Sequence, residues 1–183
     1  MKNHFAPVAA VILASSAFLG TVAQADTEKA TFAYHVGDGF AVLNNTGNTA
    51  VAENGDMVTV SGTGTFDVVG KTAAGGGTFT HKRADGTIVA TGTWTATELL
   101  AFQSYGPGTP QGTPASFFGG RAALAIVGTP TGTTLMLPGI LEIECALGTP
   151  PGGAEEGVRL LVKGIINFNK SVHESGENVF VKQ

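Results

Sequence analysis

The chain has 183 residues, with 10 Lys plus Arg against 14 Asp plus Glu, and a formal net charge of −4 at pH 7. This acidic balance argues against a nucleic-acid partner, because phosphate backbones are bound by clusters of basic side chains. Hydrophobic residues make up 43% and charged residues 13% of a chain that contains 27 glycines, so the composition favours a folded protein over a disordered one.

Residues 1–25 have the pattern of a secretory signal peptide. Lys2 precedes an apolar run at 9–20, and the small residues AQA follow at 23–25. The apolar run is shorter than the roughly 20 residues of a membrane span, although an uncleaved N-terminal anchor is the alternative interpretation. We therefore expect cleavage after Ala25 and one mature domain over residues 26–183, secreted or periplasmic.

The elements expected after the signal peptide are all strands. No stretch combines helical periodicity with capping residues, and most of the chain alternates with period two between turn residues. In chain order, the expected strands cover residues 30–43 with a bend at 37–39, 57–70, 77–83, 87–102, 121–127, 133–147 with a break at 138–139, 158–168 and 178–181. Polar loops are expected at 44–55 and 103–120.

The dipeptide Asp85-Gly86 is the clearest turn signal in the chain. Between two alternating runs it favours a two-residue type I′ hairpin. Counting outward from this turn pairs His81 with Ala90, Phe79 with Gly92, and Gly77 with Trp94. Each large ring is thus expected to lie across from a glycine.

A second hairpin, centred on Lys71-Thr72, extends this alternation in our interpretation. It would place Phe66 opposite Gly77, and Gly64 opposite Phe79. Aromatic rings that cover glycines on neighbouring strands shield the backbone and restore packing that glycine lacks.

About eight strands in mostly hairpin order predict an all-β fold. We expect a single antiparallel β-barrel, with a β-sandwich as the alternative. The architecture resembles that of soluble secreted barrels such as lipocalins and dirigent or allene oxide cyclase proteins, a resemblance that transfers no residue role. The outer face should pair Thr78 with Thr93 and Thr80 with Thr91, and such a threonine ladder argues against a membrane-embedded barrel.

The candidate ligand-binding residues are aromatic or titratable side chains near the expected interior, namely His81, Trp94, Tyr105, Phe117 and Phe118. His81 is either a polar handle or general base among aromatic rings, or a hydrogen-bonded histidine at the rim. The last three lie in or beside the loop 103–120, which either packs down as an Ω-loop or covers the barrel mouth.

The remaining polar groups are expected to be structural. Glu142 and Glu144 should both project outward and pair with basic side chains across strands, whereas Cys145 on the same strand should be buried. Glu155-Glu156 is expected to be a loop pair with no partner beside it. No spacing predicts a metal site, a cofactor or a catalytic group.

The sequence leads to three alternative functions. The first is an exported barrel that binds a small apolar or amphipathic molecule at its mouth, the second a structural or interaction module of the cell envelope with a filled core, and the third a barrel enzyme of the isomerase or cyclase type. A void of roughly 300 Å³ or more would favour binding. The sequence identifies no protein partner.

Overall fold

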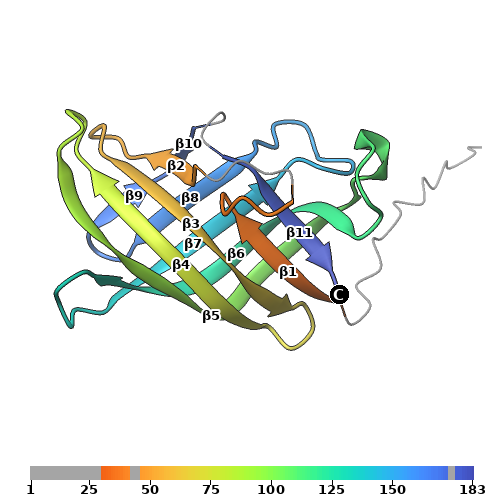
Figure 1. The fold of residues 1–183 in the computed structure, drawn as a ribbon, viewed down its shortest axis with the longest axis horizontal. Helices are drawn as coiled ribbons and strands as arrows, with labels where there is room; N and C mark the ends of the chain where they lie inside the picture. The colour runs from red at the N-terminus through yellow and green to blue at the C-terminus, as the bar shows by residue number, and fades with distance from the viewer. Residues whose placement is uncertain (1–29, 42–45, 173–175) are drawn as a thin grey trace, which may run out of the picture.

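The computed structural model describes residues 30–41, 46–172 and 176–183, so the expected signal peptide lies outside the described residues. The strands are β1 (Thr31–Val36), β2 (Asn48–Val51), β3 (Met57–Asp67), β4 (Thr72–Lys82), β5 (Ile88–Pro107), β6 (Phe117–Pro130), β7 (Leu137–Cys145), β8 (Gly157–Val162), β9 (Ile166–Phe168), β10 (Lys170–Ser171) and β11 (Asn178–Lys182) (Figure 1). One 3-10 turn, η1 (Thr109–Gln111), follows β5. The predicted all-β antiparallel fold is confirmed. In the part of the chain that the structure describes, no helix has the length and apolarity that crossing a membrane requires.

The strand pairings return to their starting point and form a ring. At one end the pairings run through β1, β3, β4, β5, β6 and β11, and β11 pairs with β1 again. At the other end they run through β2, β3, β4, β5, β6, β7 and β8 to the stretch β9–β10, which pairs with β2. We call these the narrow end and the wide end, at the right and the left of Figure 1.

The ring widens because two of its edges are each shared by two strands. Along β3, β1 pairs as far as Gly62 and β2 continues from Val60. Along β6, β7 pairs as far as Gly120 and β11 continues from Phe118. The number of strands around the ring thus rises from six to eight, and a ring of more strands encloses more space.

Phenylalanine rings fill the narrow end. Five of its six strands contribute one ring each, namely Phe32, Phe66, Phe102, Phe118 and Phe180, with neighbouring centroids 4.9–5.7 Å apart. The sixth strand, β4, places the small Ala73 opposite Phe66. Rings at these separations pack edge to face or tilted, which adds to the stabilisation from burial.

The expected β4–β5 register is confirmed from His81 inward, but the expected turn is wrong. His81 pairs with Ala90, Phe79 with Gly92, and Gly77 with Trp94. The N–H of Gly86 donates to the carbonyl of Arg83, and Gly86 alone in this turn has a positive φ. A type I turn that ends in a left-handed glycine gives a loop of three residues, 84–86, in place of the expected two. The extra loop residue shifts the pairing by one, and a bulge between His81 and Lys82 restores the expected pairing from His81 onward. Lys82 consequently pairs with Ile88.

The expected β3–β4 register is wrong by four residues. Phe66 pairs with Ala73 and Gly62 with Gly77, because the chain turns through residues 68–71 with Lys71 in a left-handed conformation at φ 55°. A shift of an even number of residues leaves each side chain on its expected face. Val58, Val60 and Phe66 are accordingly buried.

Several strand boundaries also differ from expectation. The loop 44–55 contains β2, while β5 and β6 extend into the loop 103–120 and leave only residues 108–116 outside strands. The expected break at Pro138-Gly139 lies inside β7. The expected strand 158–168 is a hairpin, because the chain turns at 163–165 with Gly164 at φ 72°.

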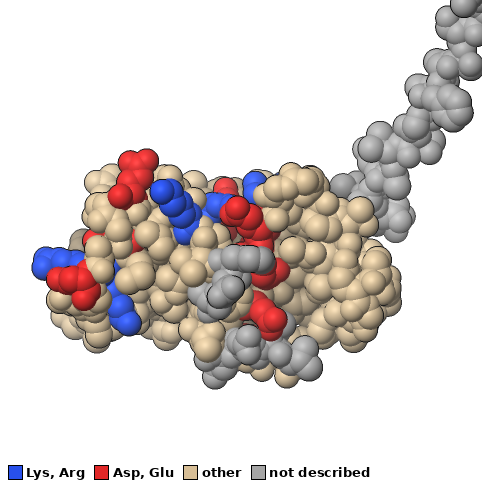
Figure 2. All heavy atoms as spheres, turned by 90° about the horizontal axis from the view of Figure 1, so that it is seen from above, with Lys and Arg blue, Asp and Glu red and all other residues tan. Residues whose placement is uncertain are grey.

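Charged side chains are unevenly spread over the surface. In the view from above, side chains of both signs lie together at the wide end on the left, and acidic side chains cross the middle of the face (Figure 2). The outer face of β3, β4 and β5 carries the expected hydroxyl side chains, and Thr78 pairs with Thr93 and Thr80 with Thr91.

Candidate functional site

A cavity of about 100 Å³ lies inside the wide end of the ring. Side chains from β3 to β9 line it, together with one residue of the β8–β9 turn. The lining consists of Val58, Val60, Phe79, His81, Ala90, Trp94, Ile126, Gly128, Pro130, Leu137, Gly139, Leu141, Leu160, Val162, Ile165, Ile166 and Phe168. Every lining residue except His81 is apolar or aromatic.

Trp94 forms the side of the cavity that faces the narrow end. Its indole is 2% exposed and stacks on Tyr34, with centroids 6.3 Å apart and 25° between the ring planes. The indole Nε1–H donates to the carbonyl oxygen of Ser61 at 3.2 Å. Because this bond occupies the only polar atom of the indole, Trp94 presents an apolar surface to the cavity.

His81 is held at the rim by an acidic partner. Its Nε2 lies 3.0 Å from Oδ2 of Asp56, and its ring meets the ring of Phe168 edge to face at a centroid distance of 5.3 Å. The side chains of His81 and Asp56 are 19% and 17% exposed. The expectation of a hydrogen-bonded histidine is confirmed, and His81 also belongs to the cavity lining.

Sequence reasoning missed Asp56, which lies between the expected loop 44–55 and the expected strand 57–70. A signal was present, since Asp56 lies two residues before Val58 and shares its inward face. Val58 pairs directly with His81, so Asp56 comes within reach of the imidazole.

Exposed apolar side chains surround the outer end of the cavity. Ile165, which lines the cavity, is 64% exposed, so the cavity lies next to the surface there. Ile88 and Val89 at the start of β5, and Leu135 and Met136 just before β7, are also exposed.

The other three predicted site residues are not brought to this cavity. Trp94 pairs with Gly128 at one end of β5 and β6, whereas Pro107 pairs with Phe118 at the other. Phe118 packs on Phe32 at 5.5 Å and Phe117 packs on Phe40 at 5.9 Å. Phe117 and Phe118, at the start of β6, are thus at the narrow end, away from His81.

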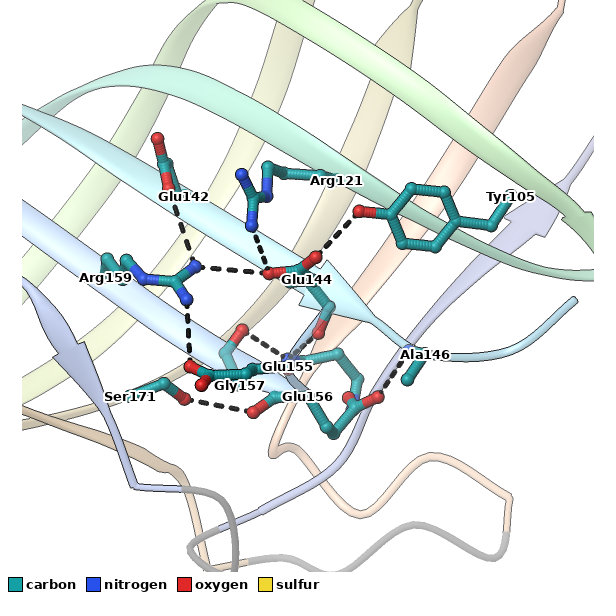
Figure 3. A network of polar contacts seen from close by, with 11 residues as sticks. Tyr105, Arg121, Glu142, Glu144, Ala146, Glu155, Glu156, Gly157, Arg159 and Ser171 are labelled. Carbon is teal, nitrogen blue, oxygen red and sulfur yellow. Dashed lines mark hydrogen bonds and ion pairs between the residues drawn. The ribbon is translucent and has the colours of Figure 1, made fainter. Parts of the chain in front are cut away.

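Tyr105 belongs instead to a polar network centred on Glu144 (Figure 3). Oε1 of Glu144 accepts the phenolic hydrogen of Tyr105 at 2.7 Å, and Oε2 accepts from Arg121 at 2.8 Å and Arg159 at 3.2 Å. Glu144 is 1% exposed, so the expectation that it projects into water is wrong. The strand alternation did place it outward, but neighbouring side chains cover it.

The network fixes the charge of Glu144. Burial alone would raise the pKa of its carboxyl, but the hydrogen bonds from Arg121, Tyr105 and Arg159 hold that pKa below the ordinary value. Burial, together with the hydrogen bond to Glu144, raises the pKa of Tyr105 to about 12. Three protein donors reach the two carboxylate oxygens, so Glu144 on β7 is joined to β5, β6 and β8.

Arg159 extends the network to two further acidic residues. It lies 3.7 Å from Glu142 and 3.1 Å from Glu155. The cross-strand pairing expected for Glu142 is confirmed. The expectation that Glu155 has no partner is wrong, because Glu155 precedes Arg159 by four residues and folds back onto it.

Glu156 is also partnered, and among the described residues the donors to its carboxylate are backbone groups. Its carboxylate accepts the N–H of Ala146 at 2.7 Å and the N–H of Asn178 at 2.8 Å. Burial raises the pKa of Glu156 to about 7 despite these bonds. The thiol of Cys145 is buried as expected, and burial raises its pKa well above the ordinary range.

Over the described residues, no group of three or more His, Cys, Asp and Glu side chains could hold a metal ion. Comparison of the chain with family models, with curated proteins and with solved structures gives no match. The cavity with His81 and Asp56 at its rim is therefore the candidate site on structural grounds alone.

Proposed function

We propose that this protein is an exported β-barrel that binds a small apolar molecule in the cavity of its wide end. The observation that carries the proposal is the lining of that cavity, in which His81 is the single polar side chain among apolar ones. Apolar cavities of this kind stay dry, and the transfer of an apolar guest from water into them is favourable.

The size of the cavity limits the ligand. Pockets for drug-sized molecules measure roughly 300–1,000 Å³, whereas an engineered cavity of about 150 Å³ lined by apolar side chains holds benzene. At about 100 Å³, the cavity fits a single aromatic ring or a short alkyl chain. A longer amphipathic molecule would leave its remainder at the surface, over exposed apolar residues such as Leu135 and Met136.

The proposal that the ring forms one barrel rests on its pairings. Both ends return to their first strand, through β11 and β1 at the narrow end and through β10 and β2 at the wide end. Closure removes the open sheet edges that would otherwise pair with other chains.

The proposal of export rests on the pattern of residues 1–25.

A structural module of the cell envelope is the second candidate. It is favoured by the narrow end, where phenylalanine rings fill the interior, and by a cavity smaller than the roughly 300 Å³ expected of a binding barrel. The two candidates differ in whether the wide end admits a guest.

Emission from Trp94 tests the proposal, because Trp94 is the single tryptophan of the chain and lines the cavity. Titration with toluene or p-xylene should shift or quench this emission saturably. In Gly128→Leu the response should disappear, because a Cβ on Gly128 meets only ordinary contacts, at 3.8 Å and beyond, and the added chain would occupy the cavity.

The matched control is Thr129→Leu, which adds a similar chain to the opposite face of β6 and should leave the response intact. A flat response in the unsubstituted protein, together with a higher unfolding midpoint for Gly128→Leu, would favour the structural module.

A further inference from the structure

We propose that the Asp56–His81 pair is the recognition element of the wide-end cavity and accepts a hydrogen bond from the hydroxyl group of a phenol-like ligand. This inference rests on the proposed function and names the ligand class of the same site. It is carried by a histidine in an otherwise apolar lining, one of whose ring nitrogens has no hydrogen bond from any described residue.

The cavity offers a ligand very few polar partners. Sixteen of its seventeen lining residues are apolar or aromatic, and the indole N–H of Trp94 is already bound to Ser61. A ligand with one polar group would therefore place that group at His81, since burying it elsewhere costs a lost hydrogen bond.

The partner of His81 decides which kind of hydrogen bond its ring offers. The carboxylate of Asp56 is an acceptor only, so the Nε2 atom 3.0 Å away carries the proton. In a neutral imidazole the second nitrogen, Nδ1, is then a bare acceptor. Among the described residues, no hydrogen bond reaches Nδ1 of His81. It is thus available to a hydroxyl donor.

Both members of the pair are held in position. Asp56 closes the β2–β3 turn, in which its carbonyl accepts the N–H of Ala52 at 2.8 Å and its own N–H donates to Oδ1 of Asn54 at 3.1 Å. The ring of Phe168 packs against the imidazole at 83° between the ring planes. A recognition group that is fixed before binding loses little conformational entropy on binding.

The chain contains a second His–Asp pair that serves as an internal control. Nδ1 of His35 lies 2.8 Å from Oδ2 of Asp38, and the ring of His35 stacks on Phe40 at 3.7 Å. Neither His35 nor Asp38 lines the wide-end cavity. The chemistry of the two pairs is alike, but the first pair adjoins the wide-end cavity and the second does not.

The test compares phenol with toluene, which are nearly equal in size and differ by a hydroxyl in place of a methyl group. Affinities for both are measured by titration of Trp94 emission in the unsubstituted protein and in Asp56→Asn. The Asn side chain can donate to Nε2, so the imidazole proton can move to Nδ1 and remove the acceptor. We expect the ratio of phenol to toluene affinity to fall about tenfold, the worth of one hydrogen bond.

Two further variants make the outcome decisive. His81→Leu should lower the ratio as Asp56→Asn does, while Asp38→Asn should leave it unchanged. Urea midpoints check that each variant is folded, and Asp56→Asn, the mildest change, carries the test if His81→Leu does not fold.

The possible outcomes separate this inference from the function on which it rests. An unchanged ratio in Asp56→Asn, with both compounds still bound, overturns the recognition role and leaves the binding function standing. Binding of benzoate in preference to phenol also overturns it, because His81 would then act as a donor. Failure of both phenol and toluene to bind overturns the proposed function itself.

Discussion

The indole of Trp94, on β5, donates its hydrogen bond to the carbonyl of Ser61, on β3, and so reaches across the whole of β4. It can do so because Gly77 lies opposite Trp94 and Gly62 lies opposite Gly77. Two adjacent residues without side chains leave the groove in which the ring lies, and the ring itself lines the cavity.

Substitution of Gly62 by Ala should destabilise the protein. A Cβ at this position would lie 2.7 Å from Cζ2 of Trp94 and would also meet the carbonyl of Gly76. We expect a loss of about 1–3 kcal/mol in the free energy of unfolding, as for other overpacked sites. Urea denaturation measures it, with Gly152→Ala as control because nothing lies within 4 Å of the added carbon there. Equal midpoints for the two variants would contradict the packing described here.

Removal of the charge of Glu144 should be costly. Glu144→Gln removes the buried carboxylate that pairs with Arg121 and Arg159, whose own side chains are 41% and 22% exposed. We expect a loss of about 1–2 kcal/mol, less than for a fully buried ion pair, because water screens the two guanidinium groups. Glu98→Gln, at an exposed position of β5, should change stability by less than about 0.5 kcal/mol. A loss for Glu144→Gln no larger than that of the control would show that the network contributes little.

The carboxyl of Glu156 should make stability fall as pH rises. Its pKa in the folded protein is about 7 against an ordinary value of 4.5, so the folded state binds the proton more tightly than the unfolded state. The stabilisation is complete below pH 4.5 and is lost as pH rises to 7, by up to about 3 kcal/mol. Glu156→Gln cannot titrate, so its stability relative to the unsubstituted protein should rise by that amount between pH 4 and pH 8.

Glu155→Gln is the matched control for this pH dependence, because Glu155 is the neighbouring residue and its side chain is largely exposed. Glu144 should act in the opposite sense, since its lowered pKa gives a stabilisation that is lost as pH falls. A parallel pH dependence in the unsubstituted protein and Glu156→Gln would show that Glu156 titrates normally.

Export predicts a defined mature N-terminus. Cleavage after Ala25 would leave Asp26 as the first residue, as the small residues at 23–25 indicate. N-terminal sequencing of protein recovered outside the cytoplasm measures this directly. Recovery of the uncleaved chain in a membrane fraction would instead support the anchor alternative.

Local turn chemistry allowed part of the fold to be predicted. Asp85-Gly86 located the β4–β5 hairpin. The predicted register holds from His81 away from the turn even though the predicted turn type was wrong, because the bulge offsets the extra residue of the three-residue loop. The β3–β4 register was missed because Lys71 takes a left-handed conformation that its residue type does not predict. Gly164 was read as a strand residue because it fits the alternation on both sides of its turn.

The candidate site was harder to predict than the strands. Alternation placed His81 and Trp94 inward, but the cavity also needs residues of β6 to β9, whose positions depend on how the ring closes. Alternation likewise placed Glu144 outward, yet it does not show which outward positions are covered. That cover depends on Tyr105 and Arg159, which lie far from Glu144 in sequence and near it in space.

The pairing of β1 with β11 has a consequence for the order of folding. Phe32 pairs with Lys182, so the first and last strands of the described chain are neighbours in the narrow end. Contacts between residues so far apart in sequence form late, because a long loop must close before they are made. Under the proposed export, β1 therefore lacks one of its two neighbours until β11 has also crossed the membrane, and the narrow end cannot close before then.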